Sequence, residues 1–237
     1  MKNSTKEIIN EINTYRDESK AAFLPRFFKT GKGEYGEGDQ FIGVVVPNLR
    51  IVAKKHFDAD FDTFRELLAS PYHEYRLTAL LALTYRYAKL KDHASRETCV
   101  NFYVSQVDAI NNWDLVDLSC YKILGHWLFD KDKQLLYDWA KENHLWKQRI
   151  AMISCMHFVK QGEFKDALAI ADLLQHHPHD LIHKAVGWIL REIGKEDEQL
   201  LIDYLTPRYK EMPRTMLRYA IERFEEEKRK AFLNSTI

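Results

Sequence analysis

The segment NNWDLVDLSCYKILGHWLF, residues 111–129, places a carboxylate beside an indole in an otherwise apolar stretch. Trp113 and Asp117 are four residues apart, so on a helix they share one face. Because the other positions are mostly apolar, we expect this helix to be central and buried on most sides. Its carboxylate would then be partly desolvated and would favour a hydrogen bond or a nearby positive charge. The simpler alternative is that Asp114 caps the helix and Asp117 is a first-turn acid favoured by the helix dipole.

A second candidate is an arginine at the start of the apolar segment HLWKQRIAMISCM. Arg149 follows Trp146 by one helical turn, and its guanidinium suits bidentate recognition of a phosphate. The alternative is a buried ion pair with an acid such as Asp117.

The third candidate is the segment DLIHKAVGWILREIG, residues 180–194. Its apolar stripe consists of Ile182, Ala185, Val186, Ile189 and Ile193. At about 100° per residue, Lys184, Trp188 and Arg191 fall together on the opposite side. A tryptophan between two cations suits a surface that meets a sugar, a base or a phosphate. The alternative is that Trp188 packs against the next layer of helices.

Other polar motifs do not predict a site. The histidines around Pro178 include His179 and His183, four residues apart, but there is no HExxH motif and no third acidic or Cys ligand nearby, so we expect no metal. The loop GKGEYGEG lacks the GK[ST] ending of a phosphate-binding loop. No GxSxG motif supplies a nucleophile.

The composition is that of a globular protein. The chain has 237 residues, of which 46% are hydrophobic and 30% are charged, with only 9 Gly and 6 Pro, which excludes a disordered or collagen-like chain. No apolar run approaches the roughly 18–20 residues of a membrane-spanning helix, and the N-terminus lacks the apolar region of a secretory signal. Three widely spaced cysteines, Cys99, Cys120 and Cys155, are predicted to be reduced and mostly buried.

The hydrophobic periodicity is helical nearly throughout. Ser4 and Glu7 form a predicted capping box, Thr63 and Glu66 a second, and Ser70-Pro71 the start of a third helix. Further helices are expected after Pro178 and Pro213, near Asp180 and Thr215. The glycine-rich stretch from Gly31 to Pro47 is predicted to be a loop that enters a helix at residues 47–56.

Four of the expected helices form a loose repeat. Each carries a polar residue near its start, and Arg76, Asp117, Arg149 and Lys184 follow one another at separations of 41, 32 and 35 residues. These intervals are near the ~40-residue period of HEAT and armadillo units. We therefore predict an all-α chain: a HEAT-like helical-repeat solenoid with a concave basic groove, forming a single domain over residues 1–237.

Four segments, taken in order, resemble the AlkD-type DNA alkylation repair glycosylases, which are built from HEAT-like repeats. The similarity spans almost the whole chain. The segments are GEGDQFIGVVVPNLR, with Phe41, Gly43, Pro47 and Arg50; Trp113-Asp114-x-x-Asp117; Trp146-Lys147-Gln148-Arg149; and residues 184–192 followed by Pro213-Arg214 and Leu217-Arg218-Tyr219.

The resemblance implies an activity and roles for particular residues. In active family members an acid, two tryptophans and an arginine meet on the concave surface; here these are Asp117, Trp113, Trp188 and Arg149. The implied reaction is hydrolysis of the N-glycosidic bond of cationic N3- or N7-alkylpurines (3-methyladenine, 7-methylguanine) in duplex DNA, without base flipping.

The resemblance also implies the partner. Alkylated duplex DNA would be held through its phosphates by Lys184, Arg191, Arg214, Arg218, Arg76 and Lys29. We expect no cofactor, no metal and no membrane, and a monomer in the cytoplasm, associated with the nucleoid through DNA. Equal numbers of basic and acidic residues, 35 each, argue against indiscriminate polyanion binding but allow a local basic groove.

The sequence departs from the family pattern in two places. Phe27 and Phe28 stand where some members have a tyrosine, and the loop from Gly31 to Gly43 is longer than in some members. Two other functions stay open: a non-catalytic HEAT-repeat scaffold that binds DNA, and a protein-interaction solenoid.

Overall fold

The computed structural model describes residues 4–237. Several of its helices begin at a polar side chain that accepts hydrogen bonds from the free backbone N–H groups of the first turn. The predicted capping box is confirmed: Ser4 Oγ accepts from Glu7 N, and the Glu7 carboxylate accepts from Ser4 N. Asp17, Asp60 and Asp92 cap later helices in the same way.

Two predicted helix starts are wrong. Asp60 Oδ1 accepts from Thr63 N at 2.8 Å, so this helix begins at Phe61 and Thr63 lies inside it. The next helix begins at His73, after both residues of the Ser70-Pro71 pair. This second helix starts late because of a short backbone pairing before it. Gln40 N donates to the carbonyl of Pro71, and His73 N donates to the carbonyl of Gln40, both at 2.9 Å. This pairing holds Pro71 and Tyr72 extended.

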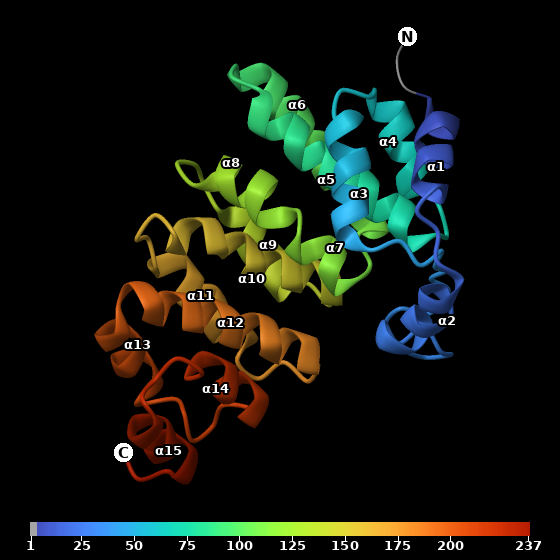
Figure 1. The fold of residues 1–237 in the computed structure, drawn as a ribbon. Coiled ribbons are helices and arrows are strands. Elements are labelled where there is room, and N and C mark those ends of the chain that lie inside the picture. Colours follow the sequence, from blue (N-terminus) through green and yellow to red (C-terminus); the bar gives the residue numbers. More distant parts are fainter. Residues whose placement is uncertain (1–3) are drawn as a thin grey trace. The chain divides into compact units, whose positions relative to one another are not determined.

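The chain divides into two compact units, Met1–Ile123 and Leu124–Ile237. A single domain over residues 1–237 stays a prediction, and its first three residues lie outside the described part. In the first unit, α5 is central and almost entirely buried over residues 73–84. Helices α3, α4, α6 and α7 pack against it (Figure 1). The helices of this unit are α1 (Thr5–Asn13), α2 (Glu18–Phe27), α3 (Val46–Lys55), α4 (Phe61–Leu68), α5 (His73–Lys89), α6 (His93–Ser105) and α7 (Trp113–Asp117).

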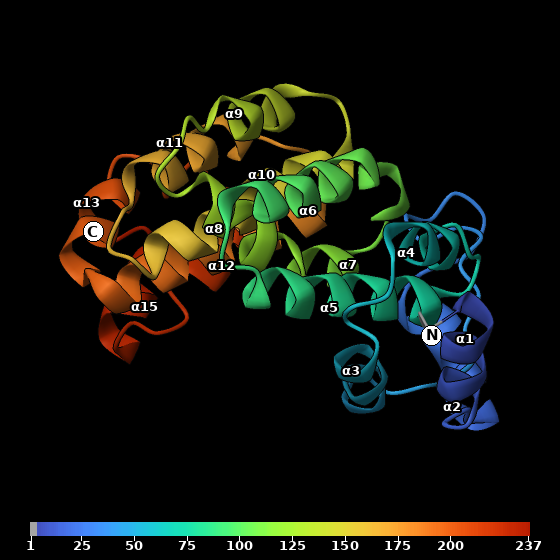
Figure 2. The same ribbon diagram turned by 90° about the horizontal axis from the view of Figure 1, so that it is seen from above.

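The second unit is built from two layers of helices (Figure 2). In one layer α9 lies beside α11, and in the other α10, α12 and α14 pack in succession. Helix α10 is buried on nearly all sides. The helices are α8 (His126–Leu128), α9 (Gln134–Lys141), α10 (Leu145–Val159), α11 (Lys165–Leu174), α12 (Asp180–Glu196), α13 (Glu198–Leu205), α14 (Arg214–Ala220) and α15 (Glu226–Asn234).

The all-α class is confirmed, since no strand occurs in residues 4–237 and the only β pairing there is the isolated bridge between Gln40 and Tyr72. Helices α12 and α14 begin after Pro178 and Pro213 as predicted. The solenoid form and the concave basic groove stay predictions. In that same part of the chain, no helix combines the length and hydropathy needed to cross a bilayer.

The glycine-rich segment is a loop that enters α3, as predicted. Gly43 in this loop has φ +84°, and a Cβ there would lie 1.9 Å from the carbonyl oxygen of Asp17. Only glycine permits this approach of the loop to the start of α2. All three cysteines are buried, in agreement with the prediction of mostly buried thiols.

Two glycines of α12 provide a test of the packing in the second unit. A Cβ at Gly187 would lie 2.5 Å from the backbone oxygen of Met216 and from Tyr219 Cβ, whereas at Gly194 it would meet the flexible end of Leu201. We expect Gly187→Ala to lower the free energy of unfolding by about 2 kcal/mol, because α14 must move away. Gly194→Ala is expected to stay within about 1 kcal/mol of wild type, since better helix propensity offsets a small shift of Leu201. Urea denaturation measures both; a Gly187→Ala protein as stable as wild type contradicts this account.

Candidate functional site

Helix α7 carries the predicted acid and the first predicted tryptophan. Its N-cap is Asn112, whose Oδ1 accepts from Trp113 N at 2.8 Å, so the alternative that Asp114 caps the helix is wrong. Trp113 and Asp117 are its first and last residues, and both side chains are half-buried. The spacing of four residues places them on one face.

The long helix expected after Trp113 is interrupted. Ser119 Oγ donates to the carbonyl of Leu115 at 2.6 Å and contacts Tyr103 Oη at 3.0 Å. A hydroxyl that bonds back along a helix bends it, and the chain continues as a π-helical turn over Tyr121–Gly125. Burial is the main reason that the pKa of Tyr103 lies well above its usual range, and the neighbouring Cys120 and Asp117 add to it. Asp117 is therefore the last residue of a short helix, and Ser119, two residues later, connects this region to Tyr103 on α6 by a hydrogen bond.

Aromatic rings hold the Trp113 indole. Phe28 stacks on it with ring centroids 5.4 Å apart and planes at 22°, and Phe27 meets it at 6.0 Å in an edge-on arrangement. Phe28 in turn stacks on Phe41 at 5.1 Å. The two phenylalanines that replace a possible tyrosine thus brace the indole through ring contacts.

A buried charge cluster lies at the start of α7, and the sequence did not predict it. His73 is 2% exposed; its Nδ1 lies 3.2 Å from Asp39 Oδ2 and its Nε2 lies 2.8 Å from Asp114 Oδ2. Burial lowers the pKa of His73, but Asp114 and then Asp39 raise it by more, to about 9. His73 is therefore charged at neutral pH. One signal was present: α5 begins with the polar residues His73, Glu74 and Arg76 although its pattern is that of a buried helix.

Arg76 belongs to the same cluster and not to the surface. It is 6% exposed, its Nη2 lies 2.6 Å from Asp39 Oδ1, and its Nη1 donates to the carbonyl of Ser70. A guanidinium in this position neutralises an interior carboxylate. We leave Arg76 out of the DNA-contact set proposed below.

The second unit carries the predicted arginine and the second predicted tryptophan. Arg149 on α10 is 4% exposed, and its Nη1 donates to the carbonyl of Leu181 in the first turn of α12. Trp188 lies on α12, half-buried, and its Nε1 donates to Glu192 Oε1 at 3.2 Å. Within this unit the structure places Arg149 at the first turn of α12 and Trp188 two turns further along that helix.

Among the predicted phosphate contacts of the second unit, Arg214 and Arg218 are exposed and Lys184 and Arg191 are half-buried, and three of the four have polar partners. Lys184 Nζ lies 2.7 Å from Asp180, Arg191 pairs with Glu222, and Arg214 donates to the carbonyl of Leu233. Arg218 is exposed, as is Lys29 in the first unit. Ion pairs between exposed side chains stabilise a protein by only about 0–1 kcal/mol, so a phosphate can replace such an acid.

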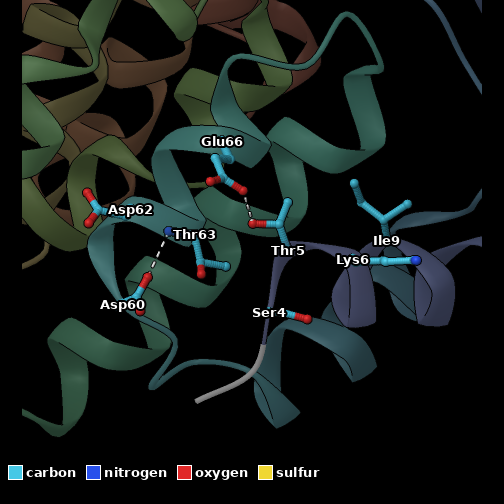
Figure 3. Close-up of a pocket in the computed structure, with 8 residues that line it drawn as sticks. All are labelled: Ser4, Thr5, Lys6, Ile9, Asp60, Asp62, Thr63 and Glu66. Carbon is cyan, nitrogen blue, oxygen red and sulfur yellow. Dashed lines mark hydrogen bonds between the residues drawn. The ribbon is translucent and has the colours of Figure 1, made fainter. Parts of the chain in front are cut away.

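A shallow recess lies between the starts of α1 and α4 (Figure 3). Thr63 N donates to Asp60 there, and Thr5 Oγ1 is hydrogen-bonded to Glu66. None of the predicted site residues lines it, and its acids disfavour an anionic ligand. The lining residues are Ser4, Thr5, Lys6, Ile9, Asp60, Asp62, Thr63 and Glu66.

The histidines around Pro178 serve as local hydrogen-bond partners. His177 Nε2 contacts Gln148 Oε1 at 3.0 Å, and His179 caps α12 by accepting from Leu181 N. No group of three or more His, Cys, Asp or Glu suited to a metal ion occurs in the part of the chain that the structure covers.

Comparison with known families and structures places this geometry in context. Residues 8–224 match the model of a family described as DNA alkylation repair enzyme. The fold is similar to a solved structure titled as a predicted DNA alkylation repair enzyme from Enterococcus faecalis, with a TM-score of 0.68 and 13% identity, covering 89% of this chain and 97% of that one. At this identity the likeness concerns the fold alone. No curated protein matches the chain.

The His73 cluster predicts how stability depends on pH. A histidine whose pKa rises from about 6.5 in the unfolded chain to about 9 in the folded protein contributes stability that is complete below pH 6.5 and lost as the pH passes 9. Each pH unit between the two values is worth about 1.4 kcal/mol, so the loss is on the order of 3 kcal/mol. Urea denaturation from pH 6.5 to 9.5 measures it. His73→Gln is expected to be less stable at pH 7 and to lose less stability with rising pH; an equal slope in both proteins contradicts this origin.

Proposed function

The chain belongs to the DNA alkylation repair enzyme family, and we propose that it is a DNA glycosylase that hydrolyses the N-glycosidic bond of N3- and N7-alkylated purines in duplex DNA. The observation that carries the proposal is the half-buried Asp117 carboxylate on the same face of α7 as Trp113. The family match supports a role in alkylation repair, and this pair supports the reaction type.

The chemistry requires a negative charge more than a strong acid. Alkylation at N3 or N7 makes the purine cationic, so it leaves without being protonated. The sugar then develops positive, oxocarbenium-like character. A fixed carboxylate beside it stabilises the transition state more than the ground state. Asp117 has this role in the proposal and also positions the attacking water.

The indoles and the arginine hold the substrate around the reacting bond. Trp113 and Trp188 would contact the deoxyribose, and their π faces favour the positive charge that develops there. The resemblance assigns a flanking phosphate to Arg149; because this side chain is 4% exposed and bonded to the Leu181 carbonyl, the contact would require the first turn of α12 to move. That these three side chains and Asp117 meet on one surface stays a prediction of the family resemblance.

Surface cations would hold the DNA backbone, and the base would stay largely in the helix. Phosphate contacts carry position and not sequence, which suits an enzyme that must find damage in any sequence. The proposed contacts are Lys184, Arg191, Arg214, Arg218 and Lys29.

Replacement of the acid gives the sharpest test. We expect Asp117→Asn to abolish release of 7-methylguanine from methylated duplex DNA, a fall of at least about 100-fold, because an amide does not stabilise the cationic sugar. DNA binding should be unchanged or tighter, since a negative charge has been removed. Asp62→Asn, at a carboxylate with an 84% exposed side chain, is the matched control and should keep wild-type activity.

The outcomes of this test separate the possible functions. Excision by Asp117→Asn at the wild-type rate contradicts the role of this acid. A wild-type protein that binds DNA without releasing base is a scaffold, and one that does not bind DNA at moderate salt is a protein-interaction solenoid.

The second tryptophan gives an independent prediction. We expect Trp188→Ala to slow excision by roughly tenfold, the effect of losing one stacking contact, with a melting temperature within a few degrees of wild type. Trp139 on α9, which is 6% exposed, is the control: Trp139→Ala should lower the melting temperature strongly, because it leaves a cavity. An equally large fall in Trp188→Ala would assign that indole to packing.

A further inference from the structure

We propose that His73 is a positioning residue for the glycosylase reaction: as an imidazolium between Asp39 and Asp114, and in contact with the ring that supports Trp113, it fixes the place of α7. The inference rests on the proposed function, because it names what holds the candidate acid and indole in position. His73 itself lies one helix away from them, on α5.

The geometry requires a doubly protonated ring. Nδ1 faces Asp39 Oδ2 at 3.2 Å and Nε2 faces Asp114 Oδ2 at 2.8 Å. An ionised carboxylate only accepts hydrogen bonds, so each nitrogen must carry a proton to make both contacts. Both acids are buried, with side chains 2% and 8% exposed. A neutral imidazole would instead place an unprotonated nitrogen, itself a hydrogen-bond acceptor, against a carboxylate oxygen, which is unfavourable in the interior.

The contacts converge on the first turn of α7. Asp114 is the second residue of that helix, and its other oxygen has no hydrogen-bond partner among residues 4–237, so His73 supplies its side-chain hydrogen bond. Asn112, the N-cap, donates from Nδ2 to Asp39 Oδ2 at 3.4 Å. A five-residue helix is too short to be stable alone. Its place is therefore decided by contacts of this kind.

A second path connects the imidazolium to the indole through ring contacts. The His73 ring lies 4.8 Å from Phe28 and 5.0 Å from Phe41, measured between centroids. Phe28 is also the ring that stacks on Trp113. A cation against an aromatic face is favourable, so protonated His73 holds Phe28 and, through it, the indole.

The charges around His73 balance only in its protonated form. The groups that face it are Asp39, Asp114 and Arg76. Glu74, next to it on α5, is occupied by the backbone N–H groups of residues 42–44. Two carboxylates and two cations make a neutral cluster. Loss of the His73 proton leaves a buried net negative charge at the N-terminal end of α7.

The experiment compares three single variants with wild type. His73→Gln removes the cation. Asp114→Asn removes one partner of the imidazole and is milder, so it keeps the test valid if His73→Gln folds poorly. Glu11→Gln is the matched control, because Glu11 Oε2 contacts another buried histidine of the same unit, His56, at 2.7 Å, away from α7.

The first readout is the single-turnover rate of 7-methylguanine release between pH 6.5 and 9.5, with spontaneous release subtracted at each pH. We expect the wild-type rate to fall as the pH approaches 9, and the fall to begin at least about one pH unit lower in Asp114→Asn, which loses the strongest interaction that raises the pKa of His73. His73→Gln should be slower by about tenfold or more at pH 7 with DNA affinity within threefold of wild type. Glu11→Gln should match wild type throughout.

The second readout does not depend on activity. In protein labelled with 5-fluorotryptophan, the Trp113 resonance is identified by its absence in Trp113→Phe. We expect it to shift with pH at the midpoint at which His73 titrates, followed through ¹³C-labelled histidine. The shift should move to lower pH in Asp114→Asn, disappear in His73→Gln and be unchanged in Glu11→Gln.

The two readouts separate failure of this inference from failure of the proposed function. If the wild type releases no base, the glycosylase assignment falls, and the fluorine titration alone decides whether His73 positions the indole. If the wild type is active but Asp114→Asn and Glu11→Gln have the same pH profile and the same Trp113 resonance, His73 is structural only and the inference is overturned.

Discussion

The first unit depends on one constraint: two acidic side chains, Asp39 and Asp114, lie in an interior that excludes water. An unpaired charge in such a place is very unfavourable, so each acid must meet a cation and hydrogen-bond donors. His73 and Arg76, both on α5, provide them. Since the acids come from the glycine-rich loop and from α7, satisfying them joins three segments that are distant in sequence. The position of α7 follows from this electrostatic requirement.

Each unit presents an indole and a charged group, and each supports its indole differently. In the first unit, phenylalanine rings brace Trp113. In the second, Trp188 is held by a hydrogen bond to Glu192 on its own helix. Both indoles are half-buried, so part of each ring stays accessible while its orientation is restricted. In the proposed glycosylase reaction a fixed π surface would be useful, because a developing positive charge is stabilised best by groups that need not reorganise.

The absence of net charge is compatible with DNA as the partner. Several surface cations of the second unit are paired with acids, Lys184 with Asp180 and Arg191 with Glu222. The pair of Lys184 and Asp180 is solvent-accessible and weak, and in the proposed complex DNA phosphates would compete with such acids for their cations. Binding of this kind depends on the local arrangement of charge and not on the total.

The sequence by itself determined the all-α class, the starts of α1, α12 and α14, the loop before α3, and the family. The family was indicated by the resemblance of four segments, and the other features depend on short-range rules: periodicity, capping, and the place of proline and glycine. Trp113 and Asp117 were identified on the same basis, because a spacing of four residues is a local property of a helix. The true starts of α4 and α5, the break after α7 and the burial of Arg76 were decided by the tertiary structure. Each depends on a partner far away in the chain or on competition from a neighbouring side chain, as when Gln40 pairs with the backbone before α5. The cluster of Asp39, His73 and Asp114 belongs to this second group, because spacing along a chain carries no information about which distant charges must neutralise one another when water is removed.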